Sequence, residues 1–168
     1  MSRLLEFYRG TGLDGAGRTL AQVWDFSDEE MEDYHDFIQW LFPLREPSRY
    51  NSDAPLLTDA DIASFRADPT LGVHLLRSLD RFLNFVGLVR REGRIEPGPA
   101  FQQKRDVWTI PNHNWLRVTR VLHGLRILGL EEEGQRLFSC LDELNARGEA
   151  RISPSTLSYW KNAAFPER

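Results

Sequence analysis

The chain has 168 residues, of which 41% are hydrophobic and 27% charged, and its formal net charge is −4 at pH 7. A chain of this size buries about two-thirds of its unfolded surface, so we expect one domain over 1–168. No block of basic residues occurs, which argues against nucleic-acid binding. No run approaches the ~20 apolar residues needed to span a bilayer.

The cysteine content indicates the cellular compartment of the protein, and the lysine content indicates its source. Cys140 is the only cysteine, so no internal disulfide can form, and it is expected to fill an apolar space on the inner side of a helix. A chain without disulfides fits a reducing compartment, and we therefore expect a soluble, cytoplasmic protein. Lysine occurs only at 104 and 161, against many arginines, a bias that indicates a bacterial source.

Short helices and glycines are predicted for the N-terminal segment. Residues 1–9 favour a helix that ends at Gly10, and 19–24 favour a second, weak helix. The four glycines of 10–17 predict a flexible connector. They do not form a phosphate-binding loop, because no strand precedes them and the Lys-Ser/Thr ending is missing.

The next helix is predicted to be central to the fold. Ser27 and Glu30 have the spacing of a capping box, which predicts a helix start, and the pattern continues over 27–42. Its apolar residues spread over about half of the circumference, so we expect this helix to be covered on several sides. His35 and Gln39, four residues apart, lie together at the edge of the apolar arc.

Two more helices follow an irregular, proline-containing loop at 43–57. Thr58 and Asp61 repeat the capping-box spacing and predict a short helix. Asp68 and the proline after it predict the start of a strongly amphipathic helix. Gly87 predicts its end.

The C-terminal half is predicted to hold a long loop and three helices. Glycines and prolines disrupt periodicity over 90–111. Asn112 is a good N-cap for a helix over 113–128, a second helix is expected over 131–147, and Ser153 caps a last short one. No alternating strand pattern is found, so the predicted fold class is all-α, an irregular bundle of about six or seven helices.

Several ordered blocks resemble one known family. Residues His35 to Ser48 read HDFIQWLFPLREPS, and further blocks are FYRG at 7–10, LLT at 56–58 and HNWLRVTRVL at 113–122. Together they are similar to the opioid growth factor receptor conserved-domain family, and the resemblance implies a conserved core of about 7–163. The resemblance implies a receptor domain that recognises a peptide, and it places animal members at the nucleus and its associated membranes. It carries no catalytic or ligand-contact motif, so the candidate sites below rest on the residues themselves.

A pair of arginines is the sharpest candidate site. Arg117 and Arg120 share one face of the 113–128 helix with Gly124, whose missing side chain leaves space beneath them. Paired guanidinium groups fit a carboxylate or phosphate bidentately. Alternatively, both arginines dock against the acidic residues of 25–36.

The space beneath Arg117 and Arg120 is called the notch. Two histidines expected near it offer a second candidate site. His35 and His113 could form an acid/base or metal-binding pair. The alternative is structural, with Asn114 as a helix cap. A bound metal usually needs three or four protein ligands, and neither a metal motif nor an activated nucleophile is found, so we expect no metal and no cofactor.

These observations lead to two hypotheses. The first is a non-enzymatic binding module with a cleft between the 27–42 and 113–128 helices, whose ligand is an unknown peptide or anionic small molecule and whose tryptophans line a pocket or fill the core. The second is an enzyme on a phosphorylated or carboxylated small molecule, with the arginines clamping the anion. A homo-oligomer fits either. The candidate ligand-binding residues are His35, Gln39, Trp40, Arg45, His113, Asn114, Arg117 and Arg120.

Overall fold

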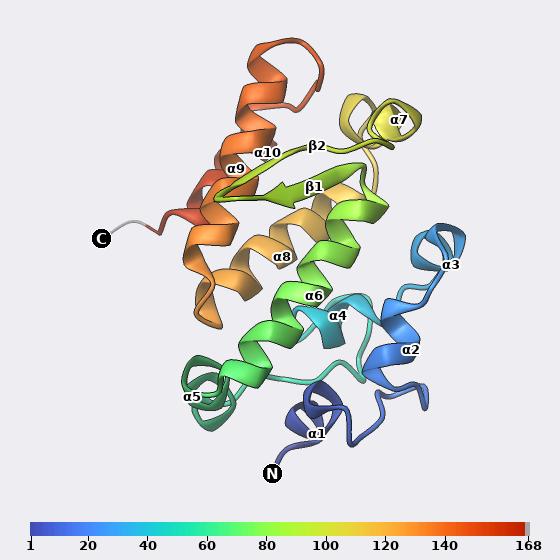
Figure 1. Cartoon of the computed structure of the whole chain (residues 1–168), viewed down its shortest axis with the longest axis vertical. Helices are drawn as coiled ribbons and strands as arrows, with labels where there is room; N and C mark the ends of the chain where they lie inside the picture. The colour runs from blue at the N-terminus through green and yellow to red at the C-terminus, as the bar shows by residue number, and fades with distance from the viewer. Residues whose placement is uncertain (167–168) are drawn as a thin grey trace. The chain divides into compact units, whose positions relative to one another are not determined.

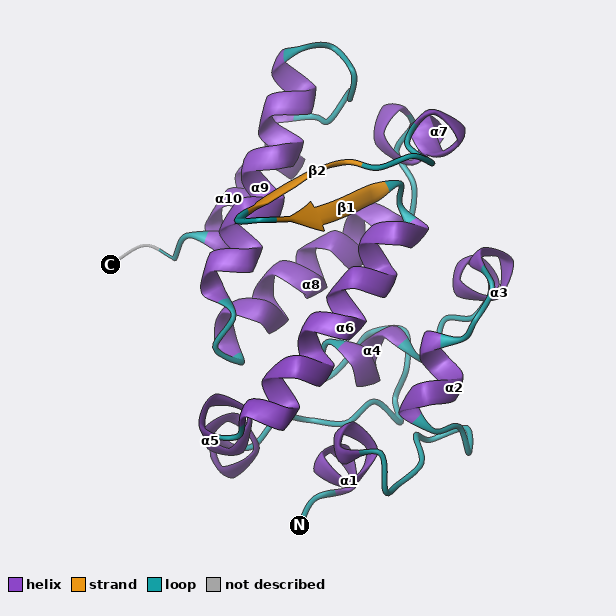
Figure 2. Ribbon diagram, in the orientation of Figure 1, coloured by secondary structure: helices purple, strands orange, loops and turns teal. Residues whose placement is uncertain are grey.

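The protein is mostly helical. The computed structural model describes residues 1–166, and in this range it contains ten α-helices, one 3-10 helix and a two-stranded sheet (Figures 1 and 2). The helical class is confirmed, but six or seven helices were too few and the sheet was not predicted. No helix between residues 1 and 166 is long and apolar enough to cross a bilayer.

The chain divides into two compact units, Met1–Arg81 and a second that starts at Phe82. The single domain expected over 1–168 stays a prediction, and its last two residues lie outside the described range. The first unit holds α1 (Arg3–Arg9), α2 (Leu20–Trp24), α3 (Asp28–Asp33), α4 (Ile38–Leu41), α5 (Asp59–Ala67) and most of α6 (Pro69–Phe85).

Local signals define most helix ends in the first unit. The capping boxes predicted at Ser27 and Thr58 are both formed, and a third is formed at Thr19. Gly10 ends α1 with a φ of 84°. A buried serine, Ser78 of α6, then ties three helices together, since its hydroxyl is 2.9 Å from that of Tyr8 in α1 and accepts a hydrogen bond from the indole of Trp24 in α2.

The single helix predicted over 27–42 is wrong. The chain leaves α3 at Tyr34, whose φ of −83° and ψ of 135° are extended, and α4 begins only at Ile38. His35 and Asp36 are exposed in this break, whereas every residue of 37–42 is buried. A straight helix would have exposed part of its wide apolar arc, and the break turns that arc inward.

The second unit begins within α6 and continues through a hairpin, a 3-10 helix and four α-helices. Its elements are β1 (Leu88–Arg91), β2 (Arg94–Pro97), the 3-10 helix η1 (Gln102–Lys104), α7 (Arg105–Thr109), α8 (Asn114–Ile127), α9 (Glu131–Ala146) and α10 (Pro154–Ala164). Helices α8, α9 and α10 pack against one another, and β2 packs against α9 (Figure 1). The hairpin and the 3-10 helix followed by α7 correct the prediction of an irregular loop over 90–111.

The hairpin has a two-residue loop, Glu92 and Gly93. Their φ values of 30° and 80° are both positive, as a turn that matches the twist of antiparallel strands requires. Arg91 pairs with Arg94 next to the loop. Pro97 lies opposite Leu88, and the next pair, Gly98 and Gly87, is joined by a backbone hydrogen bond of 2.9 Å. Because hydrogen-bonded and non-hydrogen-bonded pairs alternate in an antiparallel ladder, position 97 needs no N–H and tolerates proline.

The tryptophans belong to the core. All five are at most 9% exposed, so of the two interpretations the core one is confirmed. In the second unit, the ring of Trp160 meets those of Trp108 and Trp115 edge to face, at centroid distances of 6.4 and 6.2 Å. The indole nitrogens of Trp108 and Trp115 donate to the backbone oxygens of Val86 and Val107, which satisfies their polar edges.

Candidate functional site

In the first unit, the side chain of one predicted site residue, Gln39, is hydrogen-bonded to the backbone of another, His35. Gln39 is 4% exposed, and its amide nitrogen donates to the backbone oxygen of His35 (3.1 Å), while its oxygen lies 3.4 Å from the amide nitrogen of Asn51. Gln39 therefore supports the break before α4 and the loop after it. The predicted side-by-side placement of His35 and Gln39 on one helix face is wrong, because His35 precedes α4.

The other two have separate surroundings. Trp40 is 3% exposed, and its ring meets that of Phe7 edge to face at 5.3 Å. Arg45 is on the surface, where its guanidinium pairs with Asp59 at 2.6 Å. An exposed pair of this kind contributes little to stability.

In the second unit, the start of α8 holds the remaining candidates. Asn112 was predicted as the N-cap, but it lies one residue before the N-cap position, His113, and its side-chain oxygen accepts from the backbone N–H of Asn114 (2.9 Å). His113 is exposed and makes no side-chain cap. The side-chain oxygen of Asn114 accepts from Arg117 (3.2 Å), and both residues are buried. Arg120 is half-buried on the same helix.

Arg117 is thus hydrogen-bonded within α8. A buried guanidinium is costly unless it is hydrogen-bonded, and Asn114, which is 2% exposed, supplies one such bond. The cleft predicted between the 27–42 and 113–128 segments, with these arginines as its anion site, stays a prediction.

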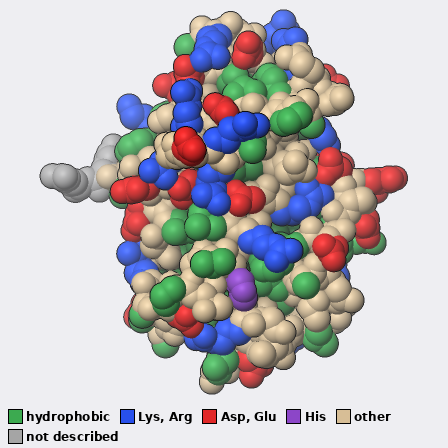
Figure 3. All heavy atoms as spheres, viewed as in Figure 1, with side chains coloured by type: hydrophobic (Ala, Val, Ile, Leu, Met, Phe, Trp, Pro, Cys, Tyr) green, Lys and Arg blue, Asp and Glu red, His purple; other side chains and the backbone are tan. Residues whose placement is uncertain are grey.

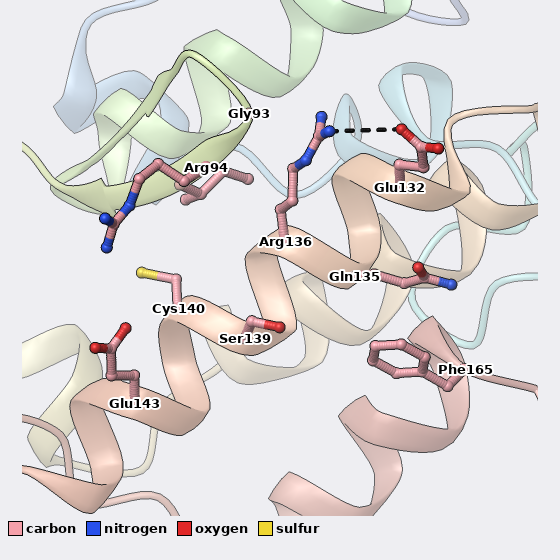
Figure 4. Close-up of a pocket in the computed structure, with 10 residues that line it drawn as sticks. Gly93, Arg94, Glu132, Gln135, Arg136, Ser139, Cys140, Glu143 and Phe165 are labelled. Carbon is pink, nitrogen blue, oxygen red and sulfur yellow. Dashed lines mark hydrogen bonds and ion pairs between the residues drawn. The ribbon is translucent and has the colours of Figure 1, made fainter.

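A cavity that the sequence did not predict lies between the hairpin and α9 (Figure 4). Its volume is about 570 Å³, and its walls are Gly93 to Ile95, one face of α9 from Glu132 to Glu143, and Phe165. A smaller cavity of about 140 Å³ continues along β2 and reaches Arg147. The two cavities share residues of both walls and are named together the hairpin groove.

The helical wall follows from the periodicity of α9. Glu132, Gln135, Ser139 and Glu143 are three or four residues apart and so lie on one side of the helix, while the apolar residues on its other side are buried. From sequence, this side reads as a solvent-exposed polar face. It becomes one wall of a groove only because the unpredicted hairpin packs beside it.

Two arginines, one in α9 and one directly after its end, are tied to carboxylates of this helix. Arg136 binds Glu133 at 2.5 Å and lies 3.5 Å from Glu132. Arg147 binds Glu143 at 2.5 Å. These pairs, spaced three or four residues apart, hold both guanidinium groups along the helix surface.

Arg94, on the hairpin, is bound much less tightly. Within the described part of the chain its side chain forms no hydrogen bond, and its one ion pair, with Glu96, is 3.7 Å long. Its side chain is 65% exposed and extends toward α9 beside Cys140 and Glu143 (Figure 4). Its donors therefore face the groove with little competition.

Cys140 lies in the groove wall but is not an activated thiol. Burial raises the pKa of Cys140 to about 12, and the nearby carboxylate of Glu143 adds to this. The thiol is thus neutral near pH 7, whereas nucleophilic cysteines need a lowered pKa. Its predicted role as an apolar filler agrees with its 5% exposure.

The charges around the groove are mixed. On the face drawn in Figure 3, acidic and basic side chains are interspersed over the hairpin and α9 and are not separated by sign. Among residues 1–166, no three His, Cys, Asp or Glu side chains come together as metal ligands would. The groove thus offers hydrogen bonds and charges of both signs.

Comparison with known proteins links the chain to one set of relatives. Residues 12–168 match the opioid growth factor receptor (OGFr) conserved region. Human opioid growth factor receptor is 35% identical over 146 residues, which are 84% of this chain and 21% of the human protein. Mouse opioid growth factor receptor-like protein 1 is 34% identical over 141 residues, 82% of this chain and 30% of that protein. The chain thus spans between a fifth and a third of these relatives, and no solved structure matches it.

Proposed function

Because the chain belongs to the opioid growth factor receptor conserved-region family, we propose that it is a non-enzymatic domain that binds short peptides, and that the hairpin groove is their binding site. By name, the human relative is a receptor for a growth factor, and the mouse relative is a receptor-like protein. The matched region is only a part of each relative, so the activity is proposed for this chain on the strength of its own groove.

The observation that carries the proposal is the chemistry of the groove walls. A volume of about 570 Å³ is within the range of sites for small ligands. Gln135 and Ser139 offer an amide and a hydroxyl for a peptide backbone, and Ile95 and Phe165 offer apolar contacts. Polar groups that fix orientation beside apolar surface are typical of binding sites.

The alternative of an enzyme has less support in the groove. Cys140, the thiol in its wall, is kept protonated by burial. Arg136 and Arg147 are already paired with carboxylates. We therefore keep the binding function as the conclusion.

Nuclear magnetic resonance of the isotopically labelled wild-type protein tests the proposal. Tetra- to hexapeptides with free termini, including an opioid peptide, are titrated while backbone amide shifts are followed. We expect saturable shifts at Ile95, Gln135 and Ser139 for at least one peptide. If no peptide shifts these amides at millimolar concentration, the groove is not a peptide site.

A double variant separates the groove from the site predicted by sequence. Arg117→Ala with Arg120→Ala removes both notch arginines without changing the groove. We expect unchanged peptide affinity, provided that circular dichroism shows a folded protein. A loss of binding in the folded double variant, together with amide shifts centred on α8, would move the site to the notch.

A further inference from the structure

We infer that the hairpin groove recognises the C-terminal carboxylate of its peptide and that Arg94 is the residue that binds it. The inference rests on the proposed peptide-binding function and adds the chemical group that is read. It follows from the position of Arg94, from the free donors of its side chain and from the charges around it.

The hairpin loop fixes the position of Arg94. Glu92 and Gly93 turn the chain within two residues, and Arg94 pairs with Arg91 immediately after them. A two-residue loop of this type has one well-defined geometry. The backbone of Arg94 is therefore held next to α9 before a ligand arrives, and only its side chain needs to adjust.

Arg94 has donors to spare, unlike the other groove arginines. Its single ion pair runs from Nε to Glu96, so its two terminal nitrogens are directed to no acceptor within residues 1–166. Arg136 and Arg147 are each bound to a glutamate at 2.5 Å. A guanidinium with both ends available is suited to a bidentate bond with a carboxylate.

The nearby carboxylates favour a singly charged group over a phosphate. Glu132 and Glu143 line the groove, and Glu96 lines its extension along β2. They would repel a phosphate, which carries nearly two negative charges at neutral pH. A carboxylate carries one charge, and the amino group of the same peptide can be balanced by the glutamates.

The rest of the groove fits the end of a peptide. On the α9 wall, the hydroxyl of Ser139 lies between Arg94 and Phe165, and the amide of Gln135 lies beside Phe165 (Figure 4). Phe165 is 39% exposed, and its ring leans on that of Phe138 at 5.9 Å. An apolar side chain near the end of the peptide would cover this exposed ring.

The test uses one peptide, the tightest binder of the panel, as a free acid and as a C-terminal amide, with affinities measured by calorimetry. For the wild-type protein we expect the amide to bind about tenfold or more weakly, because a charge-assisted bond is lost. Arg94→Gln should weaken the free acid by a similar factor and abolish the difference between the two forms. Arg94→Lys, which keeps the charge but loses the fork, should fall between.

Arg91→Gln is the matched control. Arg91 is the hairpin partner of Arg94 and is similarly exposed, and it also forms an ion pair with Glu96. Unlike Arg94, it does not line the groove. We expect its affinities for both peptides to equal those of the wild type.

Each contrary result has a distinct meaning. Equal affinity of acid and amide for the wild-type protein overturns the carboxylate inference and leaves the peptide-binding function intact. Equal weakening of both forms by Arg94→Gln shows that Arg94 does not read the carboxylate. Absence of binding by every peptide overturns the proposed function, and this inference with it.

Discussion

Two glycines with positive φ show how surroundings set the cost of a side chain. At Gly87, with a φ of 84°, an added Cβ would lie 3.0 Å from the Cβ of Lys104 and 3.0 Å from the Cα of Phe101. At Gly93, with a φ of 80°, it would meet nothing within 4 Å. Both changes impose backbone strain, but only the first adds a clash with backbone.

We therefore expect Gly93→Ala to lower the free energy of unfolding by about 1 kcal/mol, and Gly87→Ala to lower it clearly more. Urea denaturation followed by circular dichroism measures both. Equal losses would mean that η1 moves aside without cost.

The buried hydroxyl of Tyr8 makes stability sensitive to alkaline pH. Burial raises the pKa of Tyr8 well above its ordinary value, and a hydrogen bond from Ser78 offsets part of this. In the unfolded chain the phenol has its ordinary pKa of about 10. Since the folded pKa is higher, this contribution to stability is complete below about pH 10 and is lost as the pH rises further.

The variant Tyr8→Phe should thus lose less stability than the wild type between about pH 9 and pH 11, whatever its stability at pH 7. Denaturant unfolding at a series of pH values gives the slope. Tyr159→Phe, at a position that is 68% exposed, serves as the control and should keep the wild-type slope.

The thiol of Cys140 should be slow to react. With a pKa of about 12, its thiolate fraction at pH 8 is roughly a thousandth or less of that of an ordinary cysteine. We expect alkylation by iodoacetamide to be slower than that of a small thiol by about this factor. A Ser139→Cys, Cys140→Ala variant, whose thiol is exposed in the same groove, should react far faster, and equal rates would contradict the assigned burial.

At the scale of elements, one serine joins α1, α2 and α6. Tyr8 has a single hydroxyl hydrogen, which it donates to the backbone oxygen of Leu41, so Ser78 donates to Tyr8 and accepts from the indole of Trp24 (3.0 Å). Ser78 is fully buried. This chain of bonds satisfies polar groups that have no access to water.

Ser78→Ala should therefore destabilise the protein by about 1–3 kcal/mol, because the Trp24 N–H is left buried without an acceptor. Thermal and urea unfolding test this expectation. Ser158→Ala, an exposed change on α10, should be close to neutral, and a loss below about 0.5 kcal/mol for Ser78→Ala would show that water replaces the serine.

At the scale of the whole molecule, the burial of all five tryptophans gives one global signal of folding. Acrylamide should quench the fluorescence of the native protein several-fold less than that of the urea-unfolded chain, because collisions require exposed rings. Efficient quenching of the native protein would show that at least one indole is open to solvent.

The sequence by itself determined several helix ends and the family. Ser27, Thr58, Ser153 and Gly87 act within one helical turn of themselves, through caps and a positive φ, so their effect is local and readable. The ordered blocks at 35–48 and 113–122 likewise need no coordinates.

Only the tertiary structure decided the break at Tyr34, the hairpin and the groove. The break depends on where the wide apolar arc of 37–42 is buried, and the hairpin depends on a φ of 30° at Glu92, which a non-glycine residue rarely adopts. The groove joins Arg94 to residues about forty positions later on α9. Such a long-range neighbour is set by packing and leaves no local pattern to read.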